Sequence, residues 1–138
     1  MAYAFFMNAS PSGDVAVYAV TAKGLALGRT LARELPGILH APTRLAGDGA
    51  VPFDSLSALV AETFHQRRAH VFLCACGIAV RAVAPHLRGK AVDPAVVCLD
   101  DAATFAVSLL SGHLGGANDL ARRLAGLTVA VAVVTTAT

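Results

Sequence analysis

Short hydrophobic runs alternate along the chain with stretches in which apolar residues recur at helical spacing. The run Val15–Val20 contains no charged residue and is rich in valine, which favours a buried strand. Thr21 follows it and precedes apolar residues that share one helical face, so a helix capped by Thr21 is predicted. The same reasoning predicts strands over 14–20, 37–40, 70–76, 95–100, 104–109 and 128–134, and helices over 22–35, 55–67, 78–87 and 114–125.

This order of elements predicts an α/β fold, a three-layer α/β/α domain around a mainly parallel, Rossmann-like sheet of five or six strands. The connection between 95–100 and 104–109 is short enough for an antiparallel hairpin. In such sheets ligands bind beyond the carboxyl ends of the strands. We therefore expect the turns at Thr21, Gly77 and Ser111 to lie together at one edge.

The length of the chain suits one domain, which we place at 15–138. Residues 1–14 are predicted to be an N-terminal extension, in which 3–7 could form an edge strand. The segment 41–52 is rich in glycine and proline and is predicted to be a surface loop.

Composition and charge argue against several classes of protein. With 56% hydrophobic and 14% charged residues, the 138-residue chain is expected to fold rather than to be disordered. A net charge of +2 without any Lys/Arg block gives no support to nucleic-acid binding. The apolar runs are far shorter than a membrane span, and no basic residue precedes the apolar start, as it would in a signal peptide. These features predict a cytoplasmic protein that contacts neither nucleic acid nor a membrane.

The three cysteines, Cys74, Cys76 and Cys98, are odd in number and lack paired spacing, which indicates reduced thiols. Cys74 and Cys76 are expected on one face of the strand 70–76. Structural zinc usually takes four ligands, so we predict no metal site and interpret these cysteines as small buried side chains. The histidines at 40, 65, 70 and 86 are scattered and carry no motif.

The turn 111–116 is the first candidate site. Its glycines, Gly112, Gly115 and Gly116, allow positive φ angles and close approach of a ligand to the main chain. The free N–H groups at the start of the following helix would then face a carboxylate, a phosphate or an oxyanion. Polar side chains beside this opening are Ser111, His113 and Asn118. The spacing fits neither the nucleotide-binding fingerprints nor a hydrolase nucleophile elbow, and a purely structural turn is the alternative.

A second glycine turn, Gly77 to Arg81, also lies between a predicted strand and a helix. Arg81 could clamp a ligand carboxylate in a bidentate pair, although a solvated arginine is the simpler interpretation. Thr135 and Thr136 follow the last predicted strand. Their hydroxyls could line the same edge, or they could begin a linker.

Four segments resemble the N-terminal region of the CbiG family of cobalamin-biosynthesis proteins. They are 77–81 (GIAVR), 93–97 (DPAVV), 109–122 (LLSGHLGGANDLAR) and 133–138 (VVTTAT). The resemblance is strong over 70–138, whereas over 15–69 only the layout of the segments matches. The run from Leu109 to Asn118 is the most specific part.

The resemblance implies a cobalt-precorrin-5A hydrolase of the anaerobic vitamin B12 pathway. Such an enzyme opens the ring-A δ-lactone of a cobalt corrinoid and releases acetaldehyde. The cobalt would be carried by the substrate, and the protein would need no cofactor of its own. Family members continue into a linker and a C-terminal domain, so the implied partner is that domain or a split protein that replaces it.

Lactone opening needs an activated water and stabilisation of an oxyanion. We hypothesise that His113 is the general base, that N–H groups around 115–117 form the oxyanion hole, and that Ser111 and Asn118 orient water or substrate. Arg81, with Arg88 or Lys90, would supply counter-charge for the corrinoid carboxylates. The alternative is a non-catalytic domain that binds the corrinoid or docks a partner, with the catalytic residues in the C-terminal part.

Overall fold

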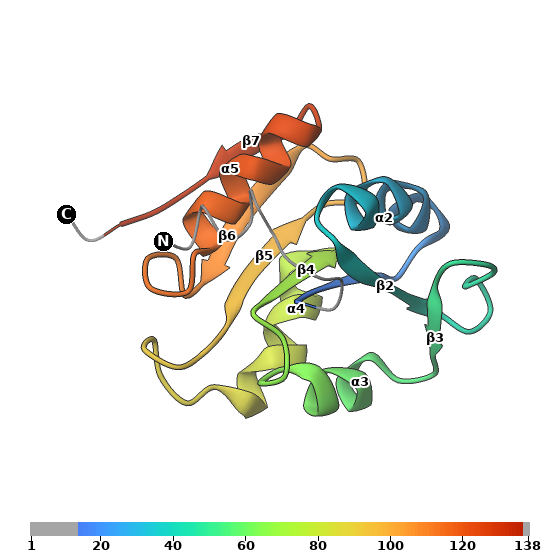
Figure 1. The fold of residues 1–138 in the computed structure, drawn as a ribbon, viewed down its shortest axis with the longest axis horizontal. Coiled ribbons are helices and arrows are strands. Elements are labelled where there is room, and N and C mark those ends of the chain that lie inside the picture. The colour runs from blue at the N-terminus through green and yellow to red at the C-terminus, as the bar shows by residue number, and fades with distance from the viewer. Residues whose placement is uncertain (1–13, 137–138) are drawn as a thin grey trace.

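The computed structural model describes residues 14–136, so the predicted extension and its edge strand at 3–7 lie outside the described residues. The described chain forms a seven-stranded sheet in the order β3-β2-β1-β4-β5-β6-β7, with helices on both faces (Figure 1). The three-layer α/β prediction is confirmed, but the described sheet has seven strands rather than the five or six predicted, because the short edge strand β3 falls in the segment predicted to be a loop. In chain order the elements are β1 (Val15–Ala19), α2 (Ala22–Glu34), β2 (Gly37–Pro42), β3 (Val51–Phe53), α3 (Leu56–Thr63), β4 (Ala69–Leu73), α4 (Cys76–Val83), the 3₁₀ turn η1 (Ala84–His86), β5 (Ala95–Leu99), β6 (Phe105–Leu110), α5 (Ala117–Leu127) and β7 (Val131–Val133).

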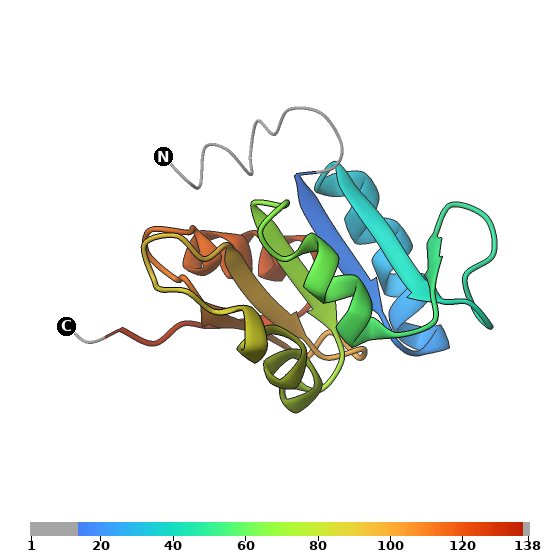
Figure 2. The same cartoon turned by 90° about the horizontal axis from the view of Figure 1, so that it is seen from below.

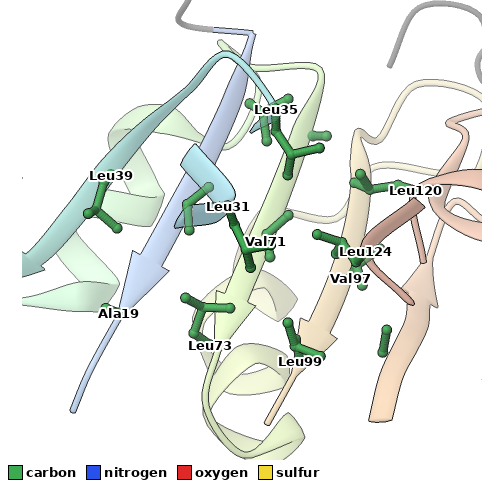
Figure 3. Packing of buried hydrophobic residues seen from close by; sticks show 14 of the residues in the cluster. Ala19, Leu31, Leu35, Leu39, Val71, Leu73, Val97, Leu99, Leu120 and Leu124 are labelled. Atoms are coloured by element: carbon green, nitrogen blue, oxygen red, sulfur yellow. The ribbon is translucent and has the colours of Figure 1, made fainter. Parts of the chain in front are cut away.

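Two apolar clusters hold the layers together. On one face α2 and α5 pack against the sheet, and Figure 3 shows Leu31 of α2 and Leu124 of α5 among residues such as Val71 and Leu99. On the other face α3 and α4 cover the middle of the sheet (Figure 2). Phe64 and Val83 belong there to one apolar cluster with Tyr18 and Phe72. Strands buried on both faces explain the uninterrupted hydrophobic runs of the sequence.

Helix caps follow the expected chemistry. The Thr21 side chain accepts a hydrogen bond from Gly24 N at 2.9 Å and starts α2, as predicted. At the start of α3 the Ser55 side chain likewise accepts a hydrogen bond from Ala58 N at 3.2 Å.

Several predicted boundaries are wrong. The strand 70–76 ends at Leu73, and Cys76 begins α4, so Cys74 and Cys76 do not share a strand face. The last helix begins at Ala117 rather than at Leu114, which is 65% exposed, and it runs past the predicted end at 125 to Leu127. The predicted loop 41–52 is shorter in the structure, because Ala41 and Pro42 belong to β2 and Val51 and Pro52 belong to the edge strand β3.

Among residues 14–136, no helix combines the length and the hydrophobicity that a bilayer crossing requires.

Candidate functional site

The two candidate turns lie at opposite edges of the sheet. β1, β4 and β5 run parallel, but β6 is antiparallel to β5, as the predicted hairpin required. Leu110, at the end of β6, therefore lies beside Val96, near the start of β5. The prediction that Thr21, Gly77 and Ser111 share one edge is wrong, because β6 runs antiparallel to β5 and therefore ends at the edge where β5 begins.

The turn 111–116 is closed by its own main chain. Ser111 O accepts from Ala117 N at 3.1 Å and Gly112 O from Asn118 N at 3.0 Å. Ser111 and Gly116 both take left-handed conformations, with φ of 57° and 88°. The expectation of free N–H groups over 115–117 is thus wrong for Ala117. Gly115 and Gly116 remain as the main-chain donors that an oxyanion hole at this turn would require.

Glycine is needed at two positions for close approach. A Cβ at Gly112 would collide with the Asn118 side chain, and a Cβ at Gly115 would lie 2.5 Å from Ser111 Cβ and 2.9 Å from Ser111 O. Asn118 is held in place because its Oδ1 accepts from Ser108 Oγ at 2.6 Å. The close approach inferred from the sequence is therefore satisfied by the chain itself. Asn118 keeps its Nδ2 group as a donor for another partner.

Replacement of Gly115 by alanine should lower the free energy of unfolding by about 1–3 kcal/mol, because the new methyl group meets backbone and Cβ atoms that cannot rotate away. Gly126 provides a matched control within α5. A Cβ there meets nothing within 4 Å, so Gly126→Ala should stabilise the protein by about 0.5–1 kcal/mol. Urea unfolding of both variants measures the difference. Equal effects of the two substitutions would contradict the close packing of the turn.

His113 and Leu114 form the exposed tip of this turn. Thr135 and Thr136 lie at the same edge of the sheet, because β7 runs parallel to β6 with Val133 beside Val107. Ser111, His113, Asn118 and the two threonines are therefore brought to one edge. Their chemical roles remain predictions.

Gly77 and Arg81 lie at the other edge, in α4. The Arg81 side chain folds back so that its Nη1 atom lies 3.1 Å from the position of a Cβ on Gly77. Nearby, Thr21 Oγ1 donates to Asp101 Oδ2 at 2.9 Å and joins the start of α2 to the β5–β6 hairpin. The neighbouring strands β1 and β4 lead into helices on opposite faces. Such a switch point is where open α/β sheets bind ligands.

A hydrogen bond with Cys98 lowers the pKa of the Cys74 thiol, but Cys74 is buried, so the cysteines offer no accessible reactive thiolate. All three are free, and Cys98 Sγ donates to Cys74 O at 3.0 Å. Burial, together with a hydrogen bond to Cys98, raises the pKa of the Cys76 thiol to about 11. Within residues 14–136, no three His, Cys, Asp or Glu side chains are arranged to hold a metal ion.

A buried polar cluster was missed by the sequence analysis, which treated its histidines as scattered. Tyr18, from β1, lies between His40 of β2 and His70 of β4, with ring centroids 5.3 and 5.8 Å away. His70 Nε2 donates to Phe64 O at 2.8 Å, because a carbonyl oxygen only accepts. In the neutral ring Nδ1 then accepts from Tyr18 OH, also at 2.8 Å, while Thr63 Oγ1 lies 2.7 Å from that hydroxyl.

Burial shifts all three rings of this cluster toward their neutral forms. It lowers the pKa of His70 from 6.5 to about 4 and raises the pKa of Tyr18 to about 12. Burial and the nearby Arg67 charge also lower the pKa of His40, whose ring nitrogens have no hydrogen-bond partner. Only the order of the strands brings these residues together, and sequence spacing carries no sign of it.

Two known proteins match nearly the whole chain in sequence. The chain is 43% identical over 133 residues to cobalt-precorrin-5A hydrolase of Salmonella typhimurium and 35% identical over 132 residues to the enzyme of that name from Priestia megaterium. These matches cover 96% and 91% of the chain but only 38% and 35% of the two relatives. The chain thus spans little more than a third of their length.

The fold has a solved counterpart. The crystal structure of a cobalamin biosynthesis protein G homolog from Sulfolobus solfataricus matches 88% of this chain and 36% of its own, with a TM-score of 0.66 and 25% identity. The family model described as "Cobalamin synthesis G N-terminal" matches residues 58–138, which include both glycine turns. The chain belongs to this family of cobalamin synthesis G N-terminal domains.

Proposed function

We propose that this chain is the N-terminal domain of a cobalt-precorrin-5A hydrolase and that it acts on a cobalt corrinoid in cobalamin synthesis. The observation that carries the proposal is 43% identity, over nearly the whole chain, to an enzyme of that name. The reaction expected from the resemblance is hydrolysis of the ring-A δ-lactone with release of acetaldehyde. The domain would work in the cytoplasm, need no cofactor of its own and receive cobalt with its substrate.

The lactone would bind at the turn 111–116. His113 is the proposed general base, since it is exposed at the tip of the turn and can be reached by a large substrate. The amides of Gly115 and Gly116 would stabilise the oxyanion, with Ser111 and Asn118 orienting water and Thr135 and Thr136 contacting the macrocycle. This arrangement keeps every proposed catalytic group at one edge of the sheet.

Gly77 and Arg81 would serve a separate contact. The strand β4 between the two edges has five residues, which at about 3.3 Å per residue separates the edges by roughly 17 Å. Arg81 is thus too far away to act on the lactone. We propose instead that it pairs with a peripheral carboxylate of the corrinoid or of the C-terminal region.

A second candidate is a non-catalytic domain that holds the corrinoid while catalysis occurs elsewhere. One observation favours it. His113 is the single titratable side chain of the turn 111–116, and no acid or base in this turn accompanies it. A general base is more often oriented by a neighbouring group.

One experiment separates these candidates. Acetaldehyde release from cobalt-precorrin-5A would be measured with the 138-residue chain alone and with a joined protein, in which this chain replaces the matching segment of the Salmonella typhimurium relative. Turnover by the chain alone is expected if catalysis is confined to this domain. Corrinoid binding without turnover by the chain, together with turnover by the joined protein, would support the holding role. Failure of the joined protein to bind or turn over the corrinoid would contradict both candidates.

A further inference from the structure

One side of the β6–β7 pair is apolar, and no helix of residues 14–136 packs over it. α5 packs on the opposite side, where Ala106 is buried beside Leu120 and Leu124. Side chains alternate along a strand, so Phe105 faces away from α5, as does Val131, its partner in β7. We name this surface the open face and define it by Phe105, Val107, Val131 and Val133.

The open face is exposed where a sheet is normally covered. Phe105 is 51% exposed and Val131 60% exposed. α3 and α4 lie on the same side of the sheet, but their apolar cluster is built on β1, β4 and β5 and reaches β6 only at Leu109 and Leu110. β7 is also the edge strand of the sheet. A contiguous exposed apolar surface of this kind marks an interaction site.

We propose that the open face binds the polypeptide that follows this domain in the family. About two thirds of each curated relative lies outside the matched segment, and the family model describes an N-terminal region. β7 ends at Val133, a residue of the open face, and the family match ends only five residues later, at 138, so polypeptide that continues from this point in the relatives has a short path to the face. An apolar surface from that segment would complete the layer that α3 and α4 leave unfinished. This inference depends on the family assignment and not on the proposed chemistry of the turn.

The test compares one substitution pair in two contexts. Phe105→Thr with Val131→Thr places a β-branched residue, which favours strands, at each position while removing apolar surface. In the chain alone, where both side chains are exposed, the pair should change Tm only slightly. In the joined protein the pair should lower Tm by about 3 °C or more beyond that change, since the same side chains are then buried. Val51→Thr is the control, because Val51 is 48% exposed on β3 at the far edge.

Binding in trans provides a second readout that does not require the joined protein to fold. The downstream region of the Salmonella typhimurium relative, made separately, should bind the chain in a calorimetric titration, and the substitution pair should weaken binding at least tenfold while Val51→Thr leaves it unchanged. Equal Tm changes in the two contexts, or binding that the pair does not affect, would overturn the proposal. The proposal would also be overturned if the chain alone forms a dimer and the substitution pair abolishes that dimer, because the open face would then bind a second copy.

Discussion

Replacement of His113 by glutamine should lower kcat for acetaldehyde release by about 100-fold or more, with KM little changed. A positioned general base contributes on the order of 10²–10⁴ in rate, and loss of a group that acts only in the transition state leaves ground-state binding intact. Glutamine retains a polar side chain of similar length without the basic nitrogen. Steady-state kinetics of the joined protein with cobalt-precorrin-5A give both parameters.

His65 provides the matched control for this substitution. It is also exposed, at the end of α3, where its Nε2 lies 2.8 Å from His86 O. His65→Gln should leave kcat and KM unchanged, because the His65 ring is engaged with His86 O and the Phe64 ring and has no part in the proposed site. If His113→Gln retains full turnover, the general-base role is wrong and the domain holds the substrate. A rise in KM at constant kcat would assign His113 to binding instead.

The alternation of strands and helices could be predicted because each element buries a continuous apolar surface. β3 was not predicted from the sequence. Val51–Phe53 is a short, exposed edge strand that contains Pro52, and it lies within a turn-rich segment. The start of α5 was predicted wrongly because Leu114 falls at helical spacing, yet the glycines around it hold the chain in a turn. Local patterns thus locate elements better than their ends.

The candidate site was harder to predict because its parts depend on strand direction. The short connection between β5 and β6 predicted a hairpin correctly. The same hairpin moves Ser111 to the edge opposite Gly77, a consequence that follows only when strand directions are traced through the whole sheet. The partners of Asn118 and the buried position of His70 depend on contacts between elements, which sequence spacing does not encode.

Acidification from pH 7.5 to pH 4 should lower the free energy of unfolding by about 3 kcal/mol through His70. Burial lowers the pKa of this ring from 6.5 to about 4 in the folded protein. Above pH 6.5 both the folded and unfolded states hold it neutral. Between pH 6.5 and pH 4 only the unfolded state binds the proton, so stability falls with pH, at about 1.4 kcal/mol per pH unit. Below pH 4 both states are protonated and this contribution stops changing.

His70→Gln isolates the contribution. A glutamine amide can still donate toward Phe64 O but does not titrate, so the variant should be less stable at pH 7.5 and should lose much of the acid dependence. Part of the loss of stability in acid should remain, because burial and the Arg67 charge also lower the pKa of His40. The sequence contains no tryptophan, so urea unfolding would be followed by circular dichroism across the pH range. An unchanged acid dependence in His70→Gln would show that Tyr18 and Phe64 admit the charged ring without cost, and the buried cluster would then be hydrated.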